Sequence, residues 1–147
     1  MAVLTAKQVA DYFLALQDED CGDALTNLKL QKLVYYAQGF HLAMKGKPLF
    51  DEGIEAWEHG PVVPSLWRCY RERGSQSIPK PKGLDFSKIP KSVRELLDEI
   101  YKVYGQFSAW KLRNMTHEEP PWRDTPRDCP IPHDRMQEYF RTLLVEG

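Results

Sequence analysis

The chain has 147 residues, of which 42% are hydrophobic and 28% are charged. This length corresponds to one domain, and the composition is that of an ordinary globular protein. Twenty Lys and Arg residues nearly balance 21 Asp and Glu residues, so the formal net charge is -1. This near-neutral balance argues against a general nucleic-acid coat and against a protein that binds anionic membranes.

The sequence predicts a cytoplasmic location. It contains no apolar run near the length of a membrane span, about 18 residues, and the start, Met1 to Lys7, lacks the long apolar stretch of a signal peptide. The cysteines at positions 21, 69 and 129 are far apart and form no CxxC pair. We therefore expect free thiols, with neither a disulfide nor a zinc site.

The first predicted helix begins after a capping box. Thr5 and Gln8 have the spacing of this motif, and apolar residues then recur at helical intervals as far as Leu16. Residues 18–23 contain four acidic side chains and one glycine, and we expect them to end this helix as an acidic loop.

The second predicted helix, which begins at Thr26 or Asn27 and closes near Gly46, is apolar on two sides. One broad face and a second stripe spaced by seven residues are both apolar, and such a helix usually lies at the centre of a fold. The members of the broad face are Leu30, Leu33, Val34, Ala37, Phe40, His41 and Met44, and those of the stripe are Leu28, Tyr35 and Leu42. A narrow polar strip between them carries Lys29, Lys32 and Tyr36.

A small β-hairpin and a third helix are predicted next. The apolar segments 48–50 and 54–57 flank an acidic turn that contains a glycine, which is typical of a hairpin. Residues 59–64 are expected to form a stiff connection because two prolines fix φ. Pro64 suits the first turn of a helix that ends before Gly74.

Residues 74–91 are rich in Gly, Ser, Pro and Lys and are predicted to form a mobile loop. The wider stretch 65–94 contains eight Lys or Arg residues and two acidic residues. This basic stretch could be a solvated face, a nucleic-acid contact or a docking surface for an acidic protein. It has few aromatic residues, which argues against the stacking of bases.

Three more helices complete the prediction. One covers 93–104, a short one is capped by Ser108, and the last follows Pro132. The prolines at 120–121 prevent the short helix from continuing. The sequence thus predicts a mostly α fold: a single compact helical domain, residues 1–147, with about six helices around a central second helix and a small β-hairpin.

Motifs of the common enzyme classes are absent from the sequence. There is no phosphate-binding glycine loop, GxSxG, HExxH or paired Cys motif. A catalytic site would need scattered residues, and a metal or acid–base cluster remains an alternative; its candidates are His41, His59, His117, His133, Glu55, Glu58, Glu118 and Glu119. We therefore predict no catalytic residues, no metal and no cofactor. His41 is expected to be a core histidine bonded to a backbone carbonyl or a carboxylate.

Two separated motifs resemble one known family. The stretch Leu28–Ala43 resembles the signature of the SocA-like, or Panacea-domain, antitoxin family, and it continues in register through three short segments: Pro48–Phe50, Glu55–Trp57 and Gly60–Pro64. The late motif of the family is matched by Thr116-His117-Glu118 and Pro121-Trp122. The resemblance extends from residue 5 to about residue 140.

The resemblance implies a mostly helical domain with a small β element and no enzymatic activity. Such proteins are antitoxins of two-gene toxin–antitoxin systems, often on mobile elements or prophages, and they neutralise a cognate protein toxin by binding it directly. The namesake of the family is an adaptor that delivers its toxin to a Clp-type protease, so a proteolytic adaptor is an alternative. A metal- or histidine-dependent hydrolase or nuclease that uses His41, His117 and Glu118 is another. Neither nucleic acid nor a membrane is expected as a partner.

In this interpretation one groove receives the toxin. The residues expected to bind the partner are Lys32, Tyr36, His117 and Glu118. The residues expected to support the groove are Tyr35, His41, Trp57 and Trp122. We expect Tyr36→Ala and His117→Ala to weaken protection from the toxin while the protein stays folded.

Overall fold

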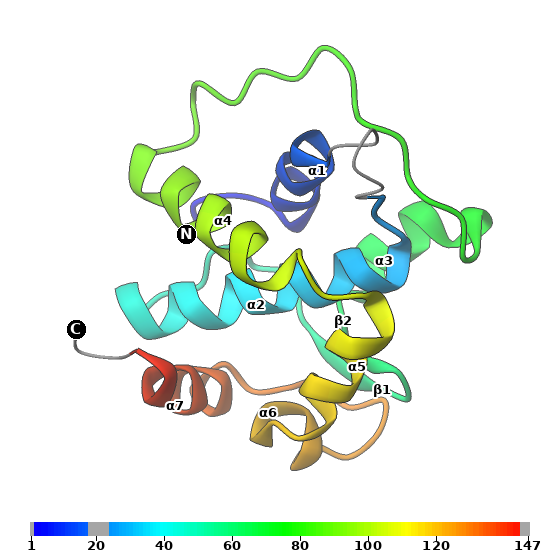
Figure 1. The fold of residues 1–147 in the computed structure, drawn as a ribbon. Helices are drawn as coiled ribbons and strands as arrows, with labels where there is room; N and C mark the ends of the chain where they lie inside the picture. The colour runs from blue at the N-terminus through cyan, green and yellow to red at the C-terminus, as the bar shows by residue number, and fades with distance from the viewer. Residues whose placement is uncertain (1, 18–23, 145–147) are drawn as a thin grey trace.

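The computed structural model describes residues 2–17 and 24–144 and is mostly helical (Figure 1). The predicted acidic loop 18–23 lies outside the described residues. Within them, seven α-helices, one short 3-10 helix and a two-stranded sheet follow one another: α1 (Ala6–Leu16), α2 (Asn27–Lys45), β1 (Glu55–Trp57), β2 (Gly60–Val62), α3 (Pro64–Tyr70), η2 (Arg71–Arg73), α4 (Lys91–Tyr104), α5 (Ala109–His117), α6 (Pro120–Arg123) and α7 (His133–Leu143). The predicted mostly helical fold with a small β element is confirmed.

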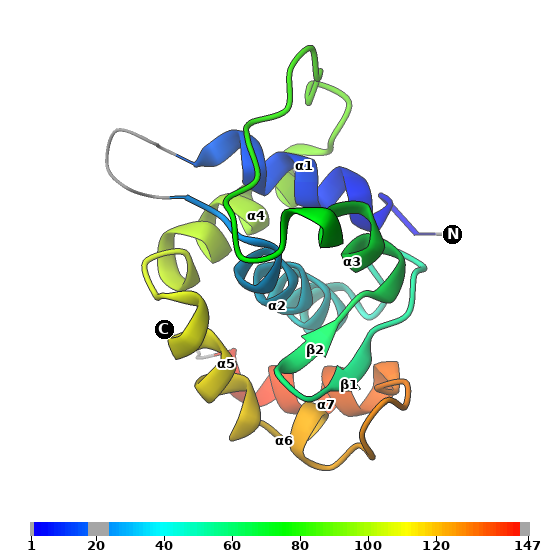
Figure 2. The ribbon, with the colours of Figure 1, turned by 90° about the vertical axis from the view of Figure 1, so that its right-hand side faces the viewer.

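Helix α2 lies at the centre of the molecule. Figure 2 shows it nearly end-on, with α1, α3 and α4 on one side and α5, α6 and α7 on the other. Members of both predicted apolar sides, such as Leu33 and Tyr35, are completely buried. Burial of so much apolar side-chain surface on two sides is the main free-energy gain that this helix contributes to folding.

Local capping sets the ends of the first two helices. The Thr5 hydroxyl accepts from the Gln8 backbone N–H at 3.2 Å, and the Gln8 side chain accepts from the Thr5 N–H at 2.8 Å. This is the predicted capping box. Helix α2 begins after Thr26, whose hydroxyl accepts from the Lys29 N–H, and ends at Gly46, whose φ of 74° favours glycine.

The hairpin was predicted at the wrong place. The strands that pair are β1 and β2, with Trp57 opposite Gly60, so the turn lies at residues 58–59. Segment 48–50 does not pair with β1, because α2 holds its backbone instead: the Gln38 side chain accepts from the Leu49 N–H at 2.7 Å and donates to the Phe50 carbonyl at 2.8 Å. The predicted stiff connection 59–64 supplies the second strand.

Residues 74–90 run above α1 as a long excursion between η2 and α4 (Figure 1). Two apolar side chains anchor it, since Ile78 and Ile89 are buried, and the Ile78 N–H donates to the Leu25 carbonyl at 2.7 Å. Leu84, in the same segment, is exposed. The mobility of this segment stays a prediction.

Cys69 and Cys129 are free thiols, as predicted, whereas Cys21 lies outside the described residues. Among the described helices, none has the length and apolar character needed to cross a membrane.

Gly39→Ala is expected to destabilise the protein by about 1–3 kcal/mol, because α2 and α7 meet at this glycine. A Cβ at position 39 would lie 2.2 Å from the ring of Phe140, which is completely buried and cannot move aside freely. Urea unfolding measures the effect. Gly53→Ala is the matched control, since a Cβ there meets nothing within 4 Å; equal losses in both variants would contradict the tight packing.

Candidate functional site

A buried carboxyl group joins α2 to the start of α6. The hydroxyls of Tyr35 and Tyr36 donate to the two oxygens of Glu119 at 2.9 and 2.8 Å. Glu119 precedes Pro120, so its backbone is extended and caps α6. Burial raises the pKa of Glu119 to about 7, although the two tyrosine hydroxyls act in the opposite direction. These three side chains form the tyrosine–Glu119 cluster.

Lys32 is completely buried beneath β2. Its ammonium nitrogen donates to the Pro61 carbonyl at 3.2 Å. The strand approaches this closely because residue 60 is glycine, with φ of 114°; a Cβ there would lie 2.5 Å from Lys32 Cε. Burial, and secondly the positive charge of Arg113, lowers the pKa of Lys32 to about 7.

Three side chains stack at the corner between α5 and α6. The rings of His117 and Trp122 are nearly parallel, with centroids 3.8 Å apart, and the Arg127 guanidinium lies 3.6 Å from the Trp122 centroid. The Trp122 indole N–H donates to the Trp57 carbonyl at 2.7 Å, which ties the corner to β1. Burial, followed by the charge of Arg113, lowers the pKa of His117.

His41 lies near the C-terminal end of α2, where it is buried and its Nδ1 is 2.7 Å from the Lys47 carbonyl. The prediction of a core histidine bonded to a backbone carbonyl is confirmed. Burial lowers its pKa.

The eight predicted site residues do not surround one groove. The structure brings Tyr35 and Tyr36 together around Glu119, and it stacks His117 on Trp122 at the corner. Trp57 joins this corner through its backbone carbonyl, while its ring packs against Trp67. Glu118 is exposed beside that corner, and Lys32 lies beneath the hairpin. His41 is about 13 Å along the helix axis from Lys32, at about 1.5 Å per residue.

The sequence predicts Glu118 as a partner-binding residue and offers Glu119 only as a member of the alternative metal or acid–base cluster. The structure buries Glu119 and exposes Glu118. Helical periodicity could not decide between the two, because the prolines interrupt the pattern at this point. The single available signal was the proline after Glu119, which forces an extended backbone there.

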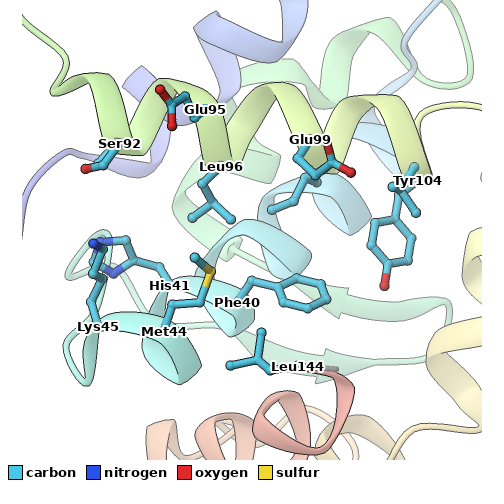
Figure 3. Close-up of a pocket in the computed structure, with 13 residues that line it drawn as sticks. Phe40, His41, Met44, Lys45, Ser92, Glu95, Leu96, Glu99, Tyr104 and Leu144 are labelled. Carbon is cyan, nitrogen blue, oxygen red and sulfur yellow. The ribbon is translucent and has the colours of Figure 1, made fainter. Parts of the chain in front are cut away.

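An apolar groove opens at another place, between the C-terminal half of α2, the length of α4 and the end of α7 (Figure 3). Its volume is about 540 Å³. Figure 3 shows Phe40 and Met44 of α2 and Leu96 of α4 facing the same space. Its walls are formed by Phe40, His41, Met44, Lys45, Ser92, Val93, Glu95, Leu96, Glu99, Ile100, Val103, Tyr104 and Leu144. We call this the α2–α4 groove.

The α2–α4 groove adjoins the tyrosine–Glu119 cluster. Tyr104 lines one end of the groove, and its ring stacks on that of Tyr36 with centroids 4.0 Å apart and planes 10° from parallel. Of the predicted site residues, His41 lines this groove, whereas Tyr36 lies one layer beneath it. The buried polar cluster therefore supports the groove from inside.

The residues of the alternative hydrolase lie in separate environments. His41 bonds to the Lys47 carbonyl at the end of α2, while His117 stacks on Trp122 at the end of α5. In the described ranges 2–17 and 24–144, no group of three or more His, Cys, Asp or Glu residues could hold a metal ion.

Comparisons with known proteins give one consistent result. The family model described as Antitoxin SocA-like, Panacea domain, matches residues 30–123. Antitoxin SocA of Caulobacter vibrioides (strain NA1000 / CB15N) is 34% identical over 109 residues, which cover 67% of this chain and 58% of that protein. The chain therefore spans less than two thirds of the length of this curated relative. No solved structure matches significantly. Because the family match covers more than half of the residues, the chain belongs to the SocA-like antitoxin family with a Panacea domain.

Proposed function

We propose that this protein is the antitoxin of a toxin–antitoxin pair and that it neutralises a protein toxin by binding it directly, without catalysis. The observation that carries the proposal is the family match over residues 30–123, which includes most of α2 and all of α3 to α6. The named relative is an antitoxin. We further propose that the chain acts as one Panacea domain in the cytoplasm.

Burial assigns different roles to the predicted partner-binding residues. Lys32 and Tyr36 expose no surface in this conformation, so we propose that they support the fold. His117 is half-buried and Glu118 is exposed. These two side chains can reach a partner, and we propose that the corner between α5 and α6 contributes to the contact with the toxin. Aromatic and charged side chains of this kind are common anchors of interfaces.

The test is to purify the tagged protein from its native cells, to identify the bound proteins by mass spectrometry and to express each of them alone and with this chain. We expect one partner to stop growth when it is expressed alone and to be harmless with this chain, and we expect the two purified proteins to form a stable complex. His117→Ala should weaken protection, with a loss of about 1 kcal/mol in stability from the partly buried stack on Trp122.

Two results would contradict this proposal. If no co-purified protein is toxic, the chain is not an antitoxin. If protection is accompanied by loss of the toxin protein, and if it requires a Clp-type protease, the chain acts as an adaptor and direct masking is wrong.

A further inference from the structure

The apolar face of helix α4 is wider than its contact with the core. Val93, Leu97 and Ile100 are buried against the core. Beside them, a stripe from Ser92 to Val103 lines the α2–α4 groove. Leu96 and Val103 are its apolar members, and Glu95 and Glu99 lie along its edge. The stripe covers eleven residue steps, or about 17 Å at about 1.5 Å per residue, which matches three turns of a second helix laid alongside.

The open side of this groove exposes large apolar side chains. Met44 is 52% exposed, Leu144 40% and Val103 39%. They come from three different elements and line the same space. Clustered exposed apolar side chains in a groove mark an interaction site more often than scattered ones. The flexible side chain of Met44, together with Leu144, can adapt its shape to the apolar face of a bound helix.

Charges on the groove differ between its walls. Glu95 and Glu99 lie on the α4 wall, one turn apart, and Lys45 lies on the α2 wall. Glu95 makes a 3.8 Å ion pair with Lys91 in which both side chains are mostly exposed, so water screens it. In the part of the chain that the structure describes, Glu99 has no ion pair. The α4 wall therefore offers two carboxylates to a cationic partner.

We propose that the α2–α4 groove receives an amphipathic helix of the toxin, with its apolar face on Met44 and Leu96 and with Lys or Arg residues along the edge that faces Glu95 and Glu99. This inference rests on the proposed function, and it assigns both the surface and the chemistry of the partner segment. Helix-in-groove binding places apolar anchors at intervals of three and four residues, which the stripe on α4 matches.

A small molecule fits this groove less well than a helix does. Sites for small ligands combine an apolar wall with several polar groups that converge on the ligand. Here the carboxylates stand on the α4 wall at the rim, and the Nδ1 atom of the His41 ring is already bonded to Lys47. The two carboxylates are therefore placed to contact the side of a helix that lies along the groove.

The experiment uses photo-crosslinking from the groove in the full chain. A benzophenone amino acid replaces Met44 or Val103, and the toxin identified by growth rescue is co-expressed with each variant. The control position is Leu84, which is exposed on the excursion between η2 and α4. We expect both groove positions to crosslink to a helical segment of the toxin that is apolar on one face and carries Lys or Arg beside it, and we expect no crosslink from Leu84.

Affinity measurements with purified proteins complete the test. Met44→Asp should weaken binding of the toxin at least thirtyfold, as loss of a central anchor does. Glu95→Lys/Glu99→Lys should weaken it about tenfold at low salt and less at high salt. The control Glu72→Lys/Glu138→Lys makes the same change in charge at exposed positions outside the groove and should bind as the wild type does. Thermal melting verifies that every variant is folded.

Failure of this inference is distinct from failure of the proposed function. If the wild type protects against the toxin but the groove variants bind normally, or if the crosslinks reach an acidic or non-helical segment, the groove assignment is wrong and the antitoxin function stands. A crosslink from the groove to this chain itself, within one copy or between two, would also overturn it. If no toxin is found, both are wrong.

Discussion

Raising the pH from 7.5 to 9.5 is expected to stabilise the wild type by about 2–3 kcal/mol relative to its Lys32→Met variant. The reason is the complete burial of the Lys32 side chain, which lowers the pKa of its amine to about 7 in the folded protein, against an ordinary lysine value of 10.5. Between these two values the unfolded chain holds one more proton than the folded one, so deprotonation favours folding.

The sign and the pH range follow from the depressed pKa. The stabilising contribution of Lys32 is fully present above pH 10.5 and is lost as the pH falls towards 7. Glu119 titrates in another range: its raised folded pKa of about 7 means that its contribution is lost as the pH rises from 4.5 to 7. The buried Tyr36 has a raised pKa and loses stability only above about pH 10. The interval from 7.5 to 9.5 therefore isolates Lys32.

Urea unfolding of both proteins across this interval measures the effect. At neutral pH we expect Lys32→Met to be the more stable protein, by about 1–4 kcal/mol, because Met occupies a similar volume without the cost of a buried amine. Loss of the donor to the Pro61 carbonyl limits this gain. Lys80→Met, at an exposed position, is the control and should leave the pH dependence unchanged. Parallel pH curves for the wild type and Lys32→Met would mean that Lys32 remains charged and hydrated.

Local signals in the sequence predicted most of the fold. Capping at Thr5 and Thr26, the stop at Gly46 and the two-sided pattern of α2 depend on neighbours within a few residues or on one helical period. The prediction of the hairpin failed because strand pairing depends on which hydrogen-bond partner each backbone segment finds, and periodicity does not describe that. The Gln38 side chain hydrogen-bonds to the backbone of segment 48–50, so this segment does not pair with β1. Strand β1 pairs instead with the segment that begins at Gly60.

Long-range packing explains why the predicted site differs from the observed one. Lys32 and Tyr36 lie on the polar strip of α2, and a polar strip is normally exposed. Here β2 and the start of α6 cover it: Tyr36 bonds to Glu119, which is 83 residues away in the sequence. Because the buried Glu119 carboxyl accepts from Tyr36, this part of the polar strip of α2 lies in the interior. The α2–α4 groove was missed for the converse reason, since the sequence places Met44 on the broad apolar face of a central helix, whereas the structure exposes it in the groove.

Tyr36→Ala is expected to destabilise the protein by about 3–5 kcal/mol, so that any loss of toxin binding reflects unfolding. The Tyr36 ring is completely buried, stacks on Tyr104 at 4.0 Å and meets the edge of Phe140 at 6.0 Å. Its removal leaves a cavity beneath the α2–α4 groove. It also leaves one oxygen of the buried Glu119 without its hydroxyl donor, which adds to the cost. This corrects the expectation that the variant stays folded.

Tyr36→Phe separates the two contributions, because it keeps the ring and removes only the hydroxyl. We expect a cost of about 1–3 kcal/mol in urea unfolding, together with a further rise in the pKa of Glu119, since the Tyr36 hydroxyl is the foremost hydrogen bond that lowers it. The folded Tyr36→Phe protein should still bind the toxin, because the hydroxyl faces the interior. If Tyr36→Ala melted like the wild type and lost only toxin binding, the ring would have to be accessible to the partner, and α6 would have to move away from α2 when the toxin binds.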